Sequence, residues 1–351
     1  MNSLRDLFWN SAEDRLRAFW RLILQVLFLL ALAIPLSILF GLIVAAFLTA
    51  SRAMTPEQLS NPLLLQQVIS NTPVLVLFSS LVSLFAILGS VWFSGRQVDH
   101  RPFLDFGFHL QRNWWVDFAF GLFLGAFLML VIFLVERSTG WVSVTGTFVT
   151  QDPGTPFALA ILLPLFSFIC VGIYEELFSR GYQLTNLAEG FNGGPVSPRL
   201  AIVLALIASS LIFGGLHYVN PNASLVSTLN IIISGIFLLG LGYVLTGELA
   251  IPIGVHIAWN FFQGNVFGFP VSGVNFTSVT FIAIKQGGPE VWTGGLFGPE
   301  AGLIGLIAVL LGGVLIALWV RWRRGWLGLH LPVAEPPTIS HLSAKGITGR
   351  G

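Results

Sequence analysis

Long apolar runs divide this chain at fairly regular intervals. They cover about residues 22 to 50, 73 to 93, 116 to 135, 157 to 188, 198 to 219, 224 to 246, 249 to 268 and 301 to 320. Each run is close to or above the ~20 residues that a helix needs to cross the hydrocarbon core of a bilayer. The pattern therefore predicts an all-α, polytopic membrane protein with about eight transmembrane helices.

The first run raises the question of a signal peptide, because four arginines precede it. The apolar core of a signal peptide holds only about 7 to 15 residues, so this longer run is expected to remain as a membrane helix. We expect residues 1–21 to form a cytoplasmic N-terminal segment and residues 22–324 a single membrane domain. Residues 325–351 are polar and contain Pro, Ser and Gly, which predicts a disordered cytoplasmic tail.

The composition supports a membrane protein. Hydrophobic residues make up 55% of the chain and charged residues 9%, against roughly 25% charged residues in soluble proteins, and the mean hydropathy is +0.83. The basic residues are dispersed between the apolar runs and the net charge is only +1, which excludes a nucleic-acid-binding patch. Cys170 is the single cysteine, so no intramolecular disulfide can form.

The basic residues also predict an orientation. With a cytoplasmic N-terminus, eight alternating helices place fourteen of the 17 Lys and Arg residues inside and three outside, namely Arg52, Arg137 and Lys285. Cytoplasmic loops of membrane proteins carry such an excess of Lys and Arg. We therefore expect both termini in the cytoplasm and the cell membrane as the location.

The run from about 157 to 188 contains two adjacent glutamates and an arginine. A carboxylate at the centre of a membrane helix costs roughly 2.5 to 3.5 kcal/mol or more, so an acid placed there usually has a function. On a helix Glu176 and Arg180 are i,i+4 neighbours that can form an ion pair, whereas Glu175 points ~100° away round the axis. We interpret Glu176 and Arg180 as a mainly structural pair and Glu175 as an acid available for chemistry.

Two later runs each contain a histidine, in the patterns Phe213-x-x-x-His217 and His256-x-x-x-Asn260. A single intramembrane histidine is more often an interhelical hydrogen-bond partner. Two histidines together with an unpaired acid favour a functional site instead. Phe213 lies one helical turn from His217 and is expected to pack beside it.

The three motifs, in this order on successive apolar segments, resemble the CPBP family of intramembrane proteases. That family groups the CAAX prenyl endopeptidases with bacterial proteins linked to bacteriocin processing and immunity. The resemblance implies a CAAX-protease-like core at about residues 157–268 and an intramembrane endopeptidase activity. It also implies that Glu175 and His217 activate a water molecule, with His256 and Asn260 in supporting roles. Prenylated substrates are not implied.

Two versions of such a site remain open. In the metal version Glu175, His217 and His256 are three ligands of a zinc ion whose fourth position holds water. In the metal-free version Glu175 is the general base, and His256 with Asn260 binds the developing oxyanion. We favour the metal-free version, because the helical spacing presents Asn260, a hydrogen-bond donor, on the same face as His256.

Two other functional classes also fit intramembrane acids and histidines. Intramembrane acids and histidines mark the pathways of ion- or proton-coupled transporters. Against a transporter, the sequence shows no internal repeat and no pair of matching broken helices. A noncatalytic membrane immunity or chaperone protein of the same fold is the second alternative, and it would tolerate the change Glu175→Gln. For a protease, the expected partners are a protein or peptide substrate reached from or near the membrane, and the lipid bilayer.

Two features of the sequence leave questions for the structure. The connection at about 268 to 300 is long, and both a surface connector and a partial lid are consistent with it. His217 falls near the outer end of its run, whereas Glu175 and His256 fall near the middle of theirs. Depth along the runs alone therefore does not predict that the three side chains meet.

Overall fold

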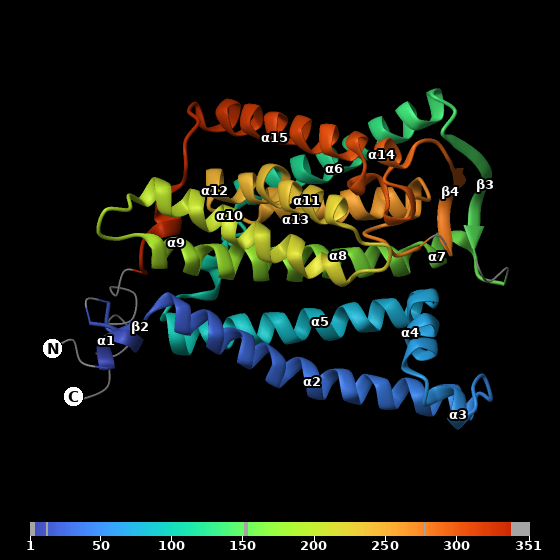
Figure 1. The fold of residues 1–351 in the computed structure, drawn as a ribbon, viewed down its shortest axis with the longest axis horizontal. Coiled ribbons are helices and arrows are strands. Elements are labelled where there is room, and N and C mark those ends of the chain that lie inside the picture. Colours follow the sequence, from blue (N-terminus) through green and yellow to red (C-terminus); the bar gives the residue numbers. More distant parts are fainter. Residues whose placement is uncertain (1–3, 12, 151–153, 277, 338–351) are drawn as a thin grey trace.

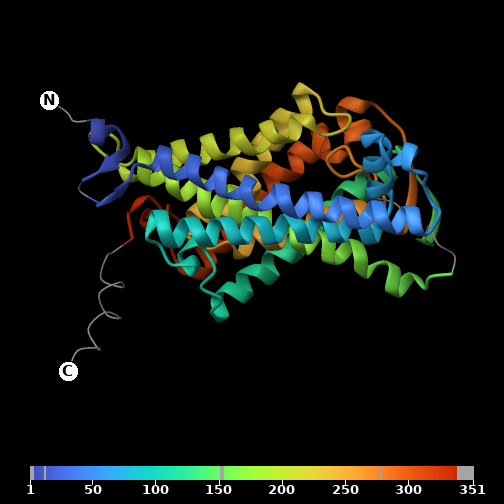
Figure 2. The ribbon, with the colours of Figure 1, turned by 90° about the horizontal axis from the view of Figure 1, so that it is seen from below.

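The structure, a computed structural model, describes residues 4–11, 13–150, 154–276 and 278–337. Its long helices run side by side along the longest axis of the molecule (Figures 1 and 2). The long helices and the helical segments that continue them are α2 (Ala18–Ala50), α5 (Pro73–Ser94) with η1 (Gly95–Asp99), α6 (Arg112–Ser138), α8 (Leu162–Glu176) with η3 (Leu177–Leu184) and α9 (Thr185–Phe191), α10 (Pro198–Leu216), α11 (Leu225–Ser234) with η5 (Gly235–Gly240) and α12 (Leu241–Thr246), α13 (Ala250–Phe261) with η6 (Phe262–Val266), and α15 (Leu303–Arg324). The shorter helices and the strands are α1 (Leu4–Phe8), β1 (Trp9–Asn10), β2 (Arg15–Leu16), α3 (Pro56–Leu59), α4 (Pro62–Asn71), β3 (Val142–Thr150), α7 (Phe157–Ala160), β4 (Val279–Gln286) and α14 (Glu290–Thr293).

Seven helices in the described part of the chain are long and apolar enough to cross a membrane. They match seven of the eight predicted runs. The remaining run, 249 to 268, forms α13 and the π-helical η6. These two segments are shorter and are enclosed by other helices, since residues 250–259 are all buried. The polytopic, all-α fold class predicted from the sequence is confirmed.

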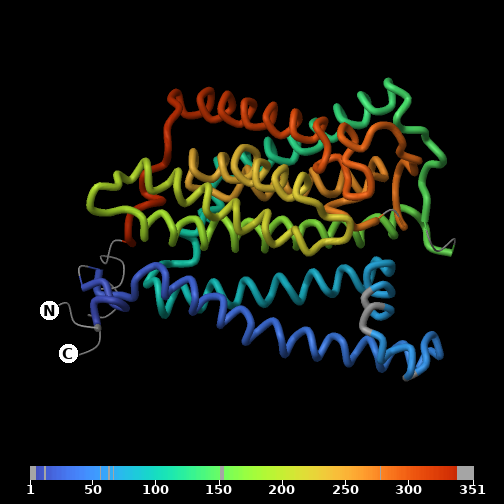
Figure 3. The backbone as a smooth tube through the Cα atoms, in the orientation of Figure 1, coloured from blue at the N-terminus to red at the C-terminus, as the bar shows by residue number. Residues whose placement is uncertain are grey.

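Successive helices lead to opposite ends of the molecule, as the tube in Figure 3 shows. One end, here called the terminal end, holds α1, α9, α12 and the last described residues (Figure 1). The other, here called the sheet end, holds α3, α4 and the strands β3 and β4 (Figure 1). α2 packs on α5, which in turn packs on α8, so α2 lies at the periphery of the bundle.

The central helix α13 packs most extensively against α6. Gly121 and Gly125 of α6 face it, because a Cβ atom on either residue would lie 2.6 Å from a carbonyl oxygen of α13. Gly254 of α13 approaches the backbone of α6 in the same way. Small residues four positions apart let two membrane helices come close together. The pair Gly121-x-x-x-Gly125 thus sets the position of α13, which carries His256 and Asn260.

The strands β3 and β4 form a two-stranded antiparallel sheet, with Val142 opposite Gln286 and a bulge between Val144 and Gly146. The hydrophobic pattern predicted no strand in either segment. The alternation of Val142 and Val144 with polar neighbours is a strand signal, but a short one beside long apolar runs. The long connection from 268 to 300 therefore contains a strand as well as loops.

A buried ionic cluster holds the terminal end together. Glu189 of α9 accepts hydrogen bonds from Arg15 and Arg101 at 2.6 Å each and from Arg21 at 3.0 Å. Asp99 pairs with Arg21 at 3.0 Å and accepts a hydrogen bond from the Tyr182 hydroxyl at 2.8 Å. These arginines thus tie the N-terminal segment to α9 and η1. From the sequence they were interpreted only as markers of orientation.

The first part of the C-terminal tail packs on the same end of the membrane domain. The backbone N–H of His330 donates to the Val244 carbonyl at 2.8 Å, and Arg101 donates to the Glu335 carbonyl at 2.9 Å. Val333 and Ala334 are buried. Residues 325–337 therefore differ from the predicted disordered tail, and residues 338–351 lie outside the described part.

Candidate functional site

Glu176 is the last residue of α8, and the π-helical η3 follows it directly. π-Helical turns within helices are frequent at functional sites. The helical path keeps Glu176 and Arg180 on one face, and Arg180 Nη1 donates to Glu176 Oε1 at 3.0 Å with both side chains buried. The structure thus contains the ion pair that the sequence predicts.

Glu176 has a second partner that the sequence did not suggest. Its Oε1 accepts a hydrogen bond from Nδ1 of His256 at 2.7 Å. Because a carboxylate only accepts, this contact assigns a proton to Nδ1. Nε2 of the same ring lies 3.8 Å from Oε2 of Glu175, beyond hydrogen-bond distance. His256 therefore sits between the two adjacent glutamates.

Arg180 is enclosed by groups from two further helices. Its Nη2 donates to the carbonyl of Gly235 at 3.4 Å, and its guanidinium lies 4.3 Å from the centre of the Phe213 ring. A Cβ atom on Gly235 would lie 3.1 Å from Ser210 and 3.2 Å from the guanidinium, so any other residue would crowd this contact. Phe213 and Gly235 are thus part of the support of the ion pair.

His217 lies where α10 ends, as the first residue of the short 3-10 helix η4 (His217–Val219). Its Nδ1 lies 2.8 Å from the Phe213 carbonyl oxygen, and its ring centre is 4.6 Å from that of Phe213, so the predicted packing of the two residues is present. A carbonyl oxygen only accepts, so Nδ1 carries the proton. In the neutral ring Nε2 is then left with a lone pair that can accept a proton.

Phe213, His217, His256 and Asn260 line one small cavity of about 40 Å³. One water molecule needs roughly 10 to 15 Å³ of such space, so the cavity has room for more than one. The complete lining is Phe213, His217, Ile231, Ser234, Leu238, Leu239, Val255, His256, Trp259, Asn260, Ser272 and Glu300. The structure therefore brings the second and third motifs together around a space that can hold water.

This cavity also accounts for the different depths of the two histidines. His217 lies toward the sheet end of α10, and His256 lies in the middle of α13. The lining extends from Leu238 and Leu239 of η5 to Ser272 and Glu300 in the loops of the sheet end. One continuous space thus spans both depths.

Glu175 lies beside this group but does not line the cavity. Its side chain is 24% exposed, and its Oε2 is buried with no hydrogen-bond partner among the described residues. The structure brings Glu175 to His256, and records no contact between Glu175 and His217 in the described part. An unsatisfied buried carboxylate oxygen is costly, which is consistent with an oxygen that binds water.

The described residues include no group of three His, Cys, Asp or Glu side chains placed to hold a metal ion. Glu175, His217 and His256 therefore do not form the three-ligand set of the metal version in this conformation. Both histidines have Nδ1 engaged by an acceptor and Nε2 left for a ligand, which is also the usual state of metal-ligating histidines. The metal-free version therefore stays a prediction, and a metal ion would have to be held by Glu175 and the Nε2 atoms of the two histidines.

Two residues of the long connection, Ser272 and Glu300, complete the cavity, and the sequence analysis singled out neither. Glu300 Oε1 accepts from the Ser272 backbone N–H at 2.5 Å and from its hydroxyl at 3.1 Å, and Oε2 accepts from the Gln263 amide. Burial raises the pKa of Glu300 to about 7, although these hydrogen bonds oppose the shift. The sequence signal that could have pointed to Glu300 is its position as an acid directly before an apolar run. Part of the connection thus closes the cavity at the sheet end.

Comparison with known proteins agrees with the motifs. Residues 157–262 match the family model described as type II CAAX prenyl endopeptidase Rce1-like. No curated protein and no solved structure matches the chain. The matched residues include all three motifs and run from α7 into η6. The segment that holds the site, residues 157–262, is therefore similar to the type II CAAX prenyl endopeptidase family that the motifs resemble.

Proposed function

We propose that this protein is an intramembrane endopeptidase that hydrolyses a peptide bond with a water molecule activated by Glu175 and His217. The observation that supports this most is the convergence of His217, His256 and Asn260 on one cavity inside the segment that matches the family. Glu175, whose Oε2 has no partner in the described part, lies next to His256. These are the groups that general-base hydrolysis needs.

In this mechanism the oxygen of the water attacks the carbonyl carbon of the scissile peptide bond. Glu175 takes the proton of the water, and His217 orients that water through the lone pair of Nε2. The proton is then delivered to the leaving nitrogen as the C–N bond breaks. His217 is suited to this role because its Nδ1 is already committed to the Phe213 carbonyl.

Asn260 and His256 bind the oxyanion that develops on the carbonyl oxygen, with His256 as the imidazolium that carries a proton on Nε2 as well as on Nδ1. They lie one turn apart on α13 and both line the cavity. The amide group of Asn260 is a hydrogen-bond donor, and Glu176 fixes the His256 ring through Nδ1. Glu176 is thus a positioning residue for His256, in addition to its pair with Arg180.

We also propose the orientation and the substrate class. Both termini lie in the cytoplasm and the protein resides in the cell membrane, because fourteen of the 17 Lys and Arg residues are then inside. In this orientation the cavity is closed by loops on the outer side. The substrate is a protein or peptide that is reached from or near the membrane, and prenylation is not required by any residue of the cavity.

Purification in detergent tests this proposal. Metal content is measured first, and proteolysis by the wild type is then compared with that by Glu175→Gln. We expect cleavage by the wild type, without dependence on bound metal, and none by the variant. A noncatalytic protein of the same fold would show no cleavage by either form, and equal cleavage by both would overturn the role of Glu175.

A further inference from the structure

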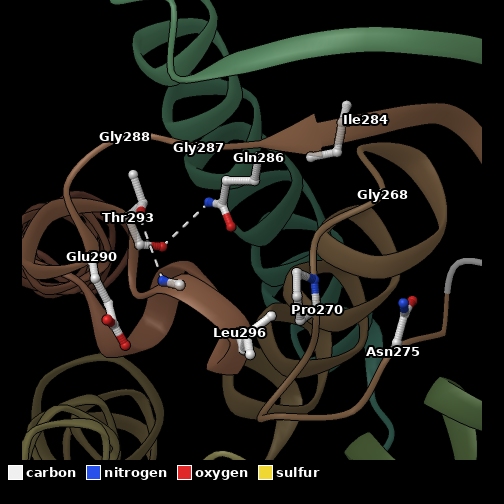
Figure 4. Close-up of a pocket in the computed structure, with 11 residues that line it drawn as sticks. Gly268, Pro270, Asn275, Ile284, Gln286, Gly287, Gly288, Glu290, Thr293 and Leu296 are labelled. Atoms are coloured by element: carbon white, nitrogen blue, oxygen red, sulfur yellow. Dashed lines mark hydrogen bonds between the residues drawn. The ribbon is translucent and has the colours of Figure 1, made fainter.

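A second and larger space lies at the sheet end, beside the small cavity. It has a volume of about 490 Å³, within the range of roughly 300 to 1,000 Å³ that is usual for ligand sites. The end of β4, the loop that follows η6 and the segment around α14 enclose it, as Figure 4 shows. Nothing in the proposed chemistry so far uses this pocket.

Only a thin wall of chain separates the pocket from the cavity of the histidines. Pro270 lines the pocket and Ser272 lines the cavity, and two residues of chain span at most about 7 Å. Gln263 joins the two sides, since its amide donates to the Pro270 carbonyl at 2.5 Å and to Glu300. A ligand in the pocket therefore lies close to the cavity.

The end of β4 faces the pocket with part of its main chain. The N–H of Gly287 donates to the Trp141 carbonyl at 2.7 Å, so it points toward the β3 side. Main-chain groups alternate in direction along a strand, so those of Ile284 and Gln286 point away from β3.

Gly268 packs against the strand at Ile282 and Ile284, since a Cβ atom on it would lie 2.5 Å from the Ile282 carbonyl oxygen and 3.5 Å from the Ile284 nitrogen. The part of this edge that Gly268 leaves open is therefore at Gln286. Ile284 and Gln286 both line the pocket, and within the described residues β4 has no strand partner other than β3. An extended peptide can add to such an edge.

The side chains that line the pocket favour a peptide over other ligands. Four glycines expose main-chain groups, and Ile284 and Leu296 provide small apolar surfaces. None of the lining residues is basic, which disfavours phosphate and lipid head groups. Glu290 is the single charged residue of the lining and is exposed, so it favours a neutral or basic partner.

From these observations we infer that the pocket is a substrate subsite, which binds an extended polypeptide segment a few residues from the scissile bond. This inference rests on the proposed endopeptidase function. The segment lies along the end of β4 at Gln286, with one apolar side chain against Leu296. The substrate then reaches the histidines from the sheet end.

Crosslinking to the full-length protein in detergent tests the subsite. The probe is a pool of random synthetic peptides of about twelve residues, an extended length of roughly 40 Å, each with one benzophenone side chain. Glu175→Gln serves as the background because it is expected to bind without cleaving. Crosslinks should map to residues 284–296. They should be lost when Leu296→Trp fills the pocket, and kept in Val291→Trp, an equally exposed position of α14 that does not line it.

Cleavage of the same pool, without the benzophenone, separates the two proposals. With active enzyme, Leu296→Trp should lower kcat/KM for long peptides roughly tenfold, because binding of remote substrate segments is lost, and Val291→Trp should not. Cleavage by the wild type combined with crosslinks that all map outside residues 284–296 would overturn the subsite alone. Crosslinks at the pocket without any cleavage would show that the pocket binds peptide, but would overturn the endopeptidase and with it the role of the pocket as a substrate subsite.

Discussion

At the scale of single residues, one oxygen of Glu176, Oε1, accepts hydrogen bonds from both the Arg180 guanidinium and the His256 ring. This arrangement explains why two adjacent acids are present. Glu176 is fully buried and paired with Arg180, whereas Glu175 is partly exposed and pairs with no arginine in the described part. The Oε2 atoms of both acids have no hydrogen-bond partner there. The sequence predicted this division through the i,i+4 spacing. It could not predict the bond to His256, because that bond depends on how α8 packs on α13.

Removal of Arg180 should destabilise the fold strongly. Arg180→Ala leaves the Glu176 carboxylate buried without its cation, and the loss for a buried pair is roughly 3 to 5 kcal/mol. The double variant Glu176→Gln with Arg180→Met leaves no lone charge and should recover part of this stability. Melting temperatures in detergent, at fixed pH and lipid content, measure the stability of Arg180→Ala and of the double variant. A double variant that melts no higher than Arg180→Ala would show that the charge itself is not the cause.

Glu300 should make the stability depend on pH. Its pKa of about 7 in the folded protein is above its ordinary value of 4.5, so the stabilisation is complete below about pH 4.5 and is lost as the pH rises through 7. The loss amounts to at most roughly 3 kcal/mol. The melting temperature of the wild type should therefore fall between about pH 5 and pH 8 more than that of Glu300→Gln. Glu290→Gln, a change at an exposed acid nearby, should keep the wild-type slope.

At the scale of elements, the position of α13 decides whether the site exists. Gly125→Leu should push α13 away from α6, because even a Cβ atom there would meet the Val255 carbonyl oxygen at 2.6 Å. Overpacking of this kind costs roughly 1 to 3 kcal/mol and should reduce activity further by moving His256. Gly41→Leu in α2 is the matched control, since a Cβ atom at Gly41 meets nothing within 4 Å. Equal melting temperatures for the two variants would contradict this role of the glycines.

The elements also show how far the sequence could predict the structure. The long apolar runs predicted the helices well, because twenty apolar residues in a bilayer have few alternatives. The spacing Gly121-x-x-x-Gly125 is a sequence signal for close helix packing, but only the structure shows that α13 is the helix that packs there. The β3–β4 sheet and the roles of Ser272 and Glu300 depend on pairing between segments far apart in the chain. Such pairing leaves little local pattern.

At the scale of the whole molecule, the two ends differ in the groups that they contain. The terminal end carries the buried ionic cluster around Glu189, and the sheet end carries the pocket and the cavity-closing loops. In the orientation proposed from the charge count, the terminal end lies in the cytoplasm. A substrate that enters from the sheet end would then come from the outer side of the membrane. Orientation and substrate access are thus linked.

Cysteine labelling in intact cells tests the orientation. Val291→Cys at the sheet end should react with an impermeant thiol reagent added outside, and Arg199→Cys at the terminal end should react only after the cells are opened. The native Cys170 is buried and should give a low background. Labelling of Arg199→Cys in intact cells would invert the proposed topology, and with it the side from which the substrate arrives.

The measurement that tests the central claim most directly is peptide cleavage by Glu175→Gln, by His217→Ala and by the double variant, with melting temperatures recorded for each. A general base contributes roughly 10²- to 10⁴-fold to a rate. Each single variant should therefore lose activity on that scale, and the double variant little more, because groups that act on one water are not additive. All three should melt near the wild type. Substantial cleavage by either single variant at wild-type stability would contradict the mechanism.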